Sequence, residues 1–207
     1  MRTPEDLKSG YRAFRTGTYR EQAELYEKLG KGQDPDIMVI ACADSRAEPA
    51  DIFNAAPGQL FVVRNVANLV PPYDTSGGLH GVSAALEFAV TALEVKHILV
   101  MGHGGCGGVN ASLSAADDKP VGRFIAPWVS LLDEVRDDVL SRAPGDPQRA
   151  LEFAGVGRSL ENLMTFPFVE ERVKAGKLDL HGAWFAIGEG ELHWRDEASG
   201  EFTLIEP

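Results

Sequence analysis

Three short, continuous runs of apolar residues constrain the fold of this chain most. They cover residues 37–41, 60–63 and 97–101 and read Ile-Met-Val-Ile-Ala, Leu-Phe-Val-Val and His-Ile-Leu-Val-Met. Runs of this length without polar alternation are typical of parallel strands that are buried on both faces. Between the second and third runs, the pattern predicts a helix from Ser83 to about Leu93, with Ser83 as its N-cap. Strands that alternate with helices predict an α/β fold with a mostly parallel central sheet flanked by helices.

The N-terminal residues predict a helical arm that precedes this sheet. Residues 3–6 read Thr-Pro-Glu-Asp, which is typical of a helix start with an N-cap, a proline at the first position and acids in the first turn. A second helix is expected over residues 21–29, where Gly30 ends it. No repeat or linker interrupts the chain, so we expect a single domain over residues 1–207, with residues 1–30 as its arm.

The C-terminal half predicts more helices and then a pair of strands. Helical stretches are expected near 123–138 and 148–163, and Pro167 is expected to open a short helix. Residues 184–187 and 191–194 flank a Gly-Glu-Gly turn. Two short runs around such a turn predict an antiparallel strand pair at the end of the chain.

The composition excludes several kinds of partner. Of the 207 residues, 44% are hydrophobic and 25% are charged, which is ordinary for a globular protein. The net charge of -11 repels phosphate backbones and anionic lipids, so we expect neither a nucleic-acid nor a membrane partner. No apolar run approaches the ~20 residues of a membrane span, and the first residues lack the apolar core of a signal peptide. We therefore expect a cytoplasmic protein.

Two polar segments directly follow the first and third apolar runs. Residues 42–46 read Cys-Ala-Asp-Ser-Arg, and residues 102–108 read Gly-His-Gly-Gly-Cys-Gly-Gly. We expect Gly102 to end the third strand. Functional groups gather outside the carboxyl ends of the strands in open α/β sheets, so both segments should face the same crevice.

Together the two segments offer Cys42, His103 and Cys106 to one metal ion. Zinc accepts this mixed set, and two cysteines, one histidine and a water form a known catalytic arrangement. Because only these three ligands are present, a fourth position is left for water or for Asp44. Parts of the pattern have other interpretations, namely two small buried cysteines, a glycine-rich phosphate cradle, or Cys42 as a nucleophile.

Asp44 and Arg46 flank Ser45 in the first of these segments. A guanidinium beside a carboxylate favours the ionised carboxylate. An ionised Asp44 can accept a hydrogen bond from hydroxide on the zinc and orient it for attack. The alternative is a surface ion pair without a catalytic role.

These segments make the chain resemble the β-class carbonic anhydrases. The matching motifs are residues 42–46, residues 61–68 (Phe-Val-Val-Arg-Asn-Val-Ala-Asn), residues 70–73 (Val-Pro-Pro-Tyr) and residues 102–108. The match covers about 32–113, and its details are similar to a plant-type subclass that includes bacterial members. The resemblance implies a carbonate dehydratase, a lyase that reversibly hydrates carbon dioxide to bicarbonate and a proton.

The same resemblance implies roles for individual residues. One Zn²⁺ per subunit would be held by Cys42, His103 and Cys106, with Asp44 and Arg46 as the catalytic dyad beside it. The substrate pocket would include Gln33, which donates a hydrogen bond, the apolar residues Phe61 and Val66, and Gly107. Phe88 stands where many members have tyrosine, so it would keep an apolar wall without donating a hydrogen bond.

The family also implies an assembly and leaves two rival functions. Its members form dimers, often paired into tetramers or octamers, and residues 1–30 would dock on a partner subunit. A carbonyl sulfide or carbon disulfide hydrolase on the same scaffold would share the ligands and the dyad. A non-catalytic zinc-binding protein would instead keep Asp44 as a permanent fourth ligand.

Four histidines lie outside the expected ligand set. His80 is a candidate proton shuttle, because histidine titrates near neutral pH, although it also suits a glycine-rich loop. We expect structural roles for the other three, which are His97, His181 and His193.

Overall fold

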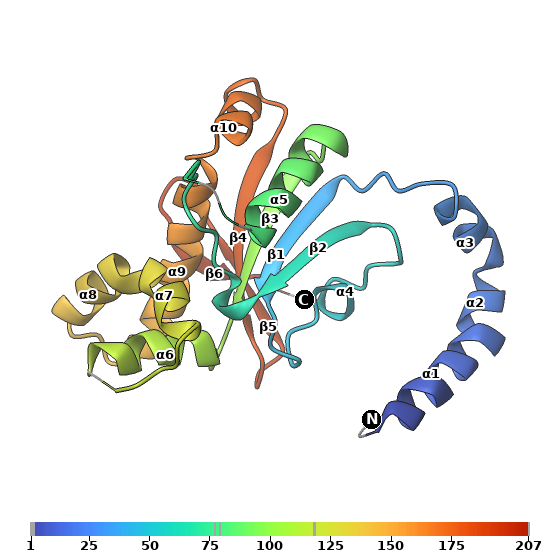
Figure 1. Ribbon diagram of the computed structural model, residues 1–207. Coiled ribbons are helices and arrows are strands. Elements are labelled where there is room, and N and C mark those ends of the chain that lie inside the picture. The colour runs from blue at the N-terminus through green and yellow to red at the C-terminus, as the bar shows by residue number, and fades with distance from the viewer. Residues whose placement is uncertain (1–2, 77, 79, 118, 207) are drawn as a thin grey trace. The chain divides into compact units, whose positions relative to one another are not determined.

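The computed structural model describes residues 3–76, 78, 80–117 and 119–206 in two compact units, Met1–Asp34 and Pro35–Pro207 (Figure 1). The smaller unit is the expected helical arm and contains α1 (Pro4–Thr16), α2 (Thr18–Glu21) and α3 (Ala23–Leu29). The predicted N-cap of α1 is Thr3, and the structure adds a reciprocal capping box with Asp6. The single domain expected over residues 1–207 stays a prediction.

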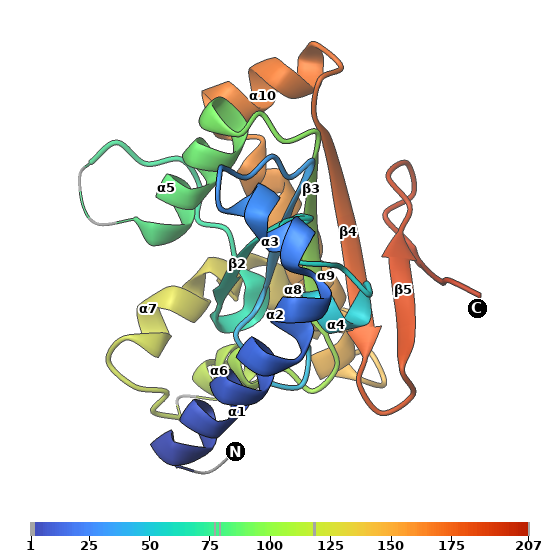
Figure 2. The same ribbon diagram turned by 90° about the vertical axis from the view of Figure 1, so that its right-hand side faces the viewer.

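The larger unit is built on one sheet, in which the described strands have the order β2-β1-β3-β4-β5-β6. The first four run parallel, and β5 and β6 are antiparallel to their neighbours at one edge (Figure 2). The expected mostly parallel sheet with C-terminal antiparallel strands is therefore confirmed. The strands are β1 (Ile37–Cys42), β2 (Leu60–Asn65), β3 (His97–His103), β4 (Asp179–Ala186), β5 (Glu191–Arg195) and β6 (Phe202–Leu204).

Helices cover this sheet in the order that the sequence pattern predicts. The stretch expected near 123–138 is divided into three short helices, and the stretch near 148–163 is one continuous helix. Within the described residues, no helix has both the length and the apolar character that a membrane crossing requires. The helical segments of this unit are α4 (Pro49–Ile52), η1 (Val66–Asn68), α5 (Gly81–Glu87), η2 (Phe88–Ala92), α6 (Gly107–Ala116), α7 (Ile125–Val129), η3 (Ser130–Leu132), α8 (Asp133–Ser141), α9 (Pro147–Leu163) and α10 (Pro167–Lys174).

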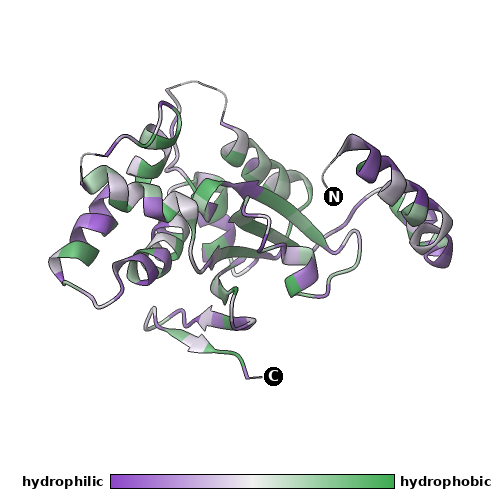
Figure 3. Cartoon of the chain, turned by 90° about the horizontal axis from the view of Figure 1, so that it is seen from below, coloured by the Kyte–Doolittle hydropathy of each residue, from purple (hydrophilic) through white to green (hydrophobic). Residues whose placement is uncertain are grey.

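The apolar strands β1 and β3 are buried on both faces and carry the core. Met38 and Ile98 pack into one apolar cluster with residues of α5, α9 and α10, whereas Val39 and Leu99 pack into a second cluster on the other face. The hydropathy colouring shows the apolar sheet at the centre of this unit (Figure 3). Because β1 and β3 pair in parallel register, their carboxyl ends lie side by side. A third apolar cluster contains Cys42 and residues of α6, α8 and α9 at that end of the sheet (Figure 1).

Two expected boundaries are wrong, and both errors have a local cause. The helix expected from Ser83 begins at Gly81, because the amide of Ala84 already donates to the carbonyl of His80 at 2.9 Å. Gly102 does not end the third strand, which continues to His103. A β-carbon at Gly102 would lie 3.0 Å from Val156, so the missing side chain lets the strand continue beneath α9.

Several other elements were not anticipated from the sequence, among them the first half of β4. The strand pair expected at the C-terminus is part of β4 and β5, but β4 begins at Asp179 and runs parallel to β3 first. No helix was expected at the residues of α4, and no strand was expected at the residues of β6. The helix that Pro167 was expected to open is confirmed as α10.

Candidate metal centre

The expected zinc ligands meet at the carboxyl ends of β1 and β3. Cys42 is the last residue of β1, His103 is the last residue of β3, and Cys106 directly precedes α6. The three residues are 6%, 1% and 1% exposed. One ligand atom from each lies within 4.8 Å of the other two. The fold therefore brings two sulfurs and one imidazole into one buried cluster.

The two sulfurs are spaced as ligands of a single tetrahedral ion. The Sγ atoms of Cys42 and Cys106 are 3.9 Å apart, and both residues are free cysteines. Two Zn–S bonds of about 2.3 Å at the tetrahedral angle would place the sulfurs about 3.8 Å apart. The hydrogen bond from Cys106 lowers the pKa of Cys42 to about 4, and the same contact raises the pKa of Cys106. A metal ion bound by both sulfurs would favour the thiolate form of both cysteines.

His103 presents an unpartnered nitrogen to this cluster. Its Nδ1 lies 3.0 Å from the carbonyl oxygen of Gly104, which assigns the proton to Nδ1. Its Nε2 is buried and has no hydrogen-bond partner among the described residues. Burial lowers the pKa of His103, whereas the Cys42 sulfur and the Gly104 carbonyl raise it. The net effect is a raised pKa. The surroundings thus favour a cation here, and a metal ion would satisfy Nε2.

Asp44 lies beside the cluster and accepts hydrogen bonds from Arg46. The backbone amide and Nε of Arg46 both donate to Oδ1 of Asp44 at 2.9 Å, and Nη2 donates to Oδ2 at 2.7 Å. This fork holds the pKa of Asp44 well below its ordinary value, so the carboxylate is an anion at neutral pH. Oδ2 also lies 3.8 Å from Nε2 of His103. The two residues of the expected dyad are therefore in contact with each other and adjacent to the cluster.

Arg64 of β2 holds the segment that carries Cys42 and Asp44. Its Nε donates to the carbonyl oxygen of Cys42 at 2.9 Å, and its Nη2 donates to the carbonyl oxygens of Asp44 at 2.6 Å and Ala47 at 3.2 Å. Its Nη1 forms an ion pair with Glu48. One guanidinium therefore fixes the backbone of the whole turn. Sequence reasoning included Arg64 only as part of a motif, because nothing local shows which carbonyls it reaches.

Glu152 of α9 is a buried carboxylate beneath the other sulfur ligand. Its Oε1 accepts hydrogen bonds from the amide of Cys106 at 2.9 Å and from Nε2 of Gln148 at 3.1 Å, and its Oε2 accepts one from Nε1 of Trp184 at 3.0 Å. The residue is only 4% exposed. All three partners are donors, so the carboxylate anchors the peptide that positions Cys106. Sequence reasoning missed this residue, which lies in an ordinary helical pattern.

The turn before α6 also requires glycine. Gly105 has a φ of 65°, which is the left-handed region that favours this residue. A β-carbon on Gly108 would lie 2.6 Å from Cγ1 of Val66 and 2.9 Å from Cβ of Ala67. The glycines therefore let α6 start directly against η1, next to Cys42. Side chains of η1 fill the space only at Gly108, because no atom lies within 4 Å of a β-carbon built on Gly105 or Gly107.

The residues expected to contact substrate lie on several elements and in both units. Phe61 of β2 and Phe88 of η2 touch, with ring centroids 6.0 Å apart, and Phe88 is 47% exposed. Val66 packs instead with the apolar cluster around Cys42, and Gly107 is the exposed first residue of α6. Gln33 belongs to the smaller unit. A pocket shared by these residues stays a prediction.

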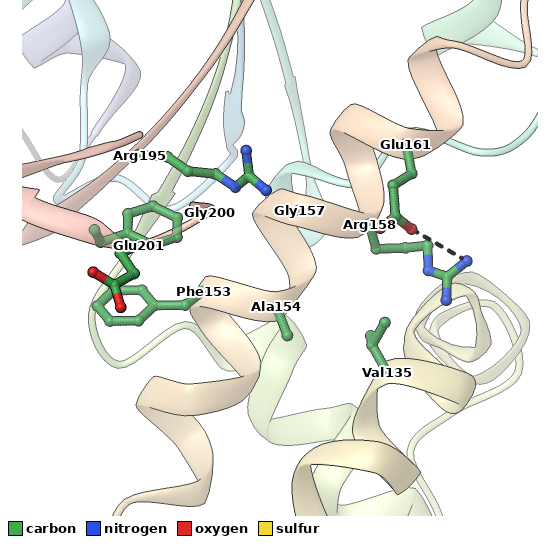
Figure 4. A pocket seen from close by; sticks show the side chains of 10 residues that line it. Val135, Phe153, Ala154, Gly157, Arg158, Glu161, Arg195, Gly200 and Glu201 are labelled. Carbon is green, nitrogen blue, oxygen red and sulfur yellow. Dashed lines mark ion pairs between the residues drawn. The ribbon is translucent and has the colours of Figure 1, made fainter. Parts of the chain in front are cut away.

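A separate hollow of about 570 Å³ lies along α9, next to β5 and β6 (Figure 4). Arg158 at its edge forms ion pairs with Glu134 at 2.8 Å and Glu161 at 3.6 Å. The hollow contains none of the expected site residues, so the chemistry of the cluster does not extend into it. Its lining residues are Val135, Phe153, Ala154, Gly157, Arg158, Glu161, Arg195, Gly200, Glu201 and Phe202.

Comparison with known proteins agrees with this arrangement. Residues 37–192 match the model of the carbonic anhydrase family. Beta carbonic anhydrase 3 of Arabidopsis thaliana is 38% identical over 192 residues, which are 90% of this chain and 74% of that protein. The structure of the β-carbonic anhydrase CcaA has a TM-score of 0.90 and 32% identity, over 98% of this chain and 92% of its own. A tetrameric β-carbonic anhydrase from Sordaria macrospora has a TM-score of 0.84 and 31% identity, over 96% and 98%. The chain therefore belongs to the β-carbonic anhydrase family.

Proposed function

We propose that this protein reversibly hydrates carbon dioxide to bicarbonate and a proton, with one zinc ion held by Cys42, His103 and Cys106. The observation that carries the proposal is the buried cluster of two sulfurs and one imidazole beside the anionic Asp44. Family membership supports the reaction. The donor set supports zinc, because thiolates and imidazole suit this ion and three protein ligands leave the open position of a catalytic site.

Zinc bound in this set would lower the pKa of a water ligand to about 7 and so supply hydroxide at neutral pH. As an anion, Asp44 can accept the hydrogen of that nucleophile at Oδ2 and orient a lone pair toward the carbon of carbon dioxide. Arg46 occupies both oxygens of Asp44, which opposes the use of this carboxylate as a permanent fourth ligand. This geometry supports a catalytic centre over a closed structural zinc site.

The remaining roles are assigned to six further residues. We propose Gln33, Phe61, Val66, Phe88 and Gly107 as the substrate contacts, on the family resemblance. The product of the proposed reaction would be bicarbonate, and regeneration of the nucleophile from water would release one proton to solvent. Exposed His80, directly before α5, is the proposed shuttle for that proton.

We also propose that the protein is a cytoplasmic homodimer, or a tetramer or octamer built from dimers, and that the helical arm over residues 1–30 docks on a partner subunit. Leu7 and Tyr11 are 60% and 63% exposed on α1, and Phe14 falls on the same helical face. A relative from Sordaria macrospora is tetrameric. Light scattering should give a multiple of the 22.4 kDa chain, and a Leu7→Glu/Tyr11→Glu variant should shift it toward the monomer.

Stopped-flow hydration of carbon dioxide with a pH indicator tests the proposed reaction. Zinc content is measured on the same protein before chelation, after chelation and after zinc is returned. We expect fast hydration that disappears with zinc and returns with it. Zinc-loaded protein that is inactive even at alkaline pH would contradict the proposal, and carbonyl sulfide and carbon disulfide would then be the substrates to test.

A further inference from the structure

Two histidines without a role in the proposed hydration reaction belong to a second cluster of potential metal ligands. We propose that His97, Asp179 and His181 form a second binding site for a divalent metal ion of the zinc class. The cluster lies at the amino ends of β3 and β4, whereas the candidate metal centre lies at the carboxyl ends of β1 and β3. The two ends of β3 are six residues apart, or about 20 Å at 3.3 Å per residue. The second site is therefore separate from the catalytic one.

Strand register brings the three side chains to one face of the sheet. His97 is the first residue of β3, and it lies directly opposite Asp179, the first residue of β4. Side chains alternate along a strand, so His181 lies two residues later on the same face as Asp179. All three potential ligands thus belong to two paired strands. Hydrogen bonding between the strands fixes the backbone of each ligand.

The spacing of the ligand atoms suits one small ion. Nδ1 of His97 lies 3.3 Å from Nε2 of His181 and 3.5 Å from Oδ2 of Asp179. Nitrogen and oxygen ligands bound at about 2.0–2.1 Å in a tetrahedral site lie about 3.3–3.4 Å apart. One ligand atom from each of the three residues lies within 4.8 Å of the others. An ion could therefore bind with small side-chain movements.

A second carboxylate orients one of the two imidazoles. Nδ1 of His181 lies 3.3 Å from Oε1 of Glu197, so the Nδ1 proton is directed to that carboxylate and Nε2 is left for a metal. Histidine ligands of metals commonly donate their other ring nitrogen to a carboxylate in this way. The Trp194 ring, with its centroid 5.6 Å from that of His181, restrains the imidazole further. This supporting layer distinguishes the cluster from an incidental pair of surface histidines.

The ligand types and their exposure indicate which ions bind and how firmly. Two imidazoles and a carboxylate suit zinc, cobalt or nickel, whereas calcium and magnesium require oxygen ligands. The side chains of His97, Asp179 and His181 are 40%, 63% and 22% exposed. Water competes at such a surface, so the second ion should exchange readily and leave before the buried one.

Metal content gives the first test, without any reference to activity. Full-length metal-free protein is equilibrated with buffered free zinc up to 100-fold above the concentration that fills the first site, and bound zinc is measured by mass spectrometry. We expect two equivalents for the parent chain and one each for His97→Ala and His181→Ala. His80→Ala removes an exposed histidine outside the cluster and should retain both equivalents.

Cobalt distinguishes the two sites by their ligands. The first equivalent of Co²⁺ should give intense sulfur-to-cobalt charge-transfer absorption, and the second only weak visible bands, which His181→Ala abolishes. Glu197→Gln should lower the affinity for the second equivalent of Co²⁺ by about tenfold or more, because it removes the carboxylate that orients His181. Saturation of the parent chain at one equivalent would overturn the proposal. So would a second equivalent that survives in the His97→Ala/His181→Ala variant.

Discussion

The two ends of β3 carry two clusters of candidate metal ligands that differ in burial and in their ligand atoms. His103 ends the strand within a buried cluster that includes two sulfurs, and His97 begins it within an exposed cluster that includes a carboxylate. Around the buried cluster, Arg64 and Glu152 hold the backbone of both cysteine ligands. Around the exposed cluster, the imidazoles contact the side chains of Asp179, Glu197 and Trp194.

This difference supports the proposed division of roles, with catalysis at one end of the strand and reversible binding at the other. A buried centre excludes bulk water, so the charges of a bound ion and of Asp44 would act strongly on a small substrate. An exposed centre has no equivalent of Asp44 held by a guanidinium among the described residues. We therefore expect changes at the buried cluster to abolish hydration and changes at the exposed cluster to leave it intact.

Cys42→Ser should have the largest effect on the hydration rate, because it changes a ligand of the buried cluster. A hydroxyl is a poor zinc ligand at neutral pH, so the buried site should lose its ion and hydration should fall by about a thousandfold or more. The exposed cluster of the same molecule is the internal control and should still bind its equivalent of zinc. The check is zinc content measured together with stopped-flow rates. Full activity in this variant would remove Cys42 from the ligand set.

Asp44→Asn should separate orientation from metal binding. The amide keeps the size of the side chain but loses the charge and one acceptor, so hydration should fall by about a hundredfold while zinc content stays at the parent value. Asp51→Asn on α4 changes an exposed carboxylate and is the matched control. Rates and zinc content are measured on both. An Asp44→Asn protein with the parent rate would show that the carboxylate does not orient the nucleophile.

Glu152→Gln should have an intermediate effect, because it acts through Cys106. The new amide group would face at least one of three donors, which costs about 1–3 kcal/mol of folding stability. Zinc affinity should fall by about tenfold or more as the Cys106 peptide loosens. Chelator competition measures the affinity, and urea denaturation measures the stability. Glu161→Gln, at an exposed position on the same helix, should change neither; equal effects from both variants would refute the positioning role of Glu152.

His97→Ala should have the smallest effect on hydration. The side chain is far from the catalytic cluster along β3, so the rate should stay within about twofold of the parent and stability should change by no more than about 0.5 kcal/mol. Steady-state hydration kinetics and thermal denaturation provide the check. A large loss of activity would mean that the second cluster contributes to the reaction. That result would contradict the proposed separation of the two clusters.

The parts of the site that sequence reasoning reached are those with a local signal. Apolar runs locate β1 and β3, and their parallel pairing alone brings Cys42 close to His103. The Asp44 and Arg46 pair is also local, since the two residues are separated by one position and bond directly. In each case, short-range sequence and a general rule about strand ends were sufficient.

The parts that were missed depend on pairing between distant segments. Glu152 meets Cys106 only because α9 crosses that end of the sheet, and 46 positions separate the two residues. His97 and His181 meet only because β4 begins at Asp179 and pairs with β3 in one particular register. The sequence pattern showed only the end of β4, so the register that unites the second cluster was not accessible from it.

A zinc titration of the metal-free protein, with hydration measured at each step, tests both metal assignments at once. We expect activity to rise in proportion to the first equivalent bound and then to stay constant while a second equivalent binds. Activity that does not follow the first equivalent would contradict the assignment of Cys42, His103 and Cys106 as the catalytic centre. Activity that rises with the second equivalent would contradict the division of roles between the two ends of β3.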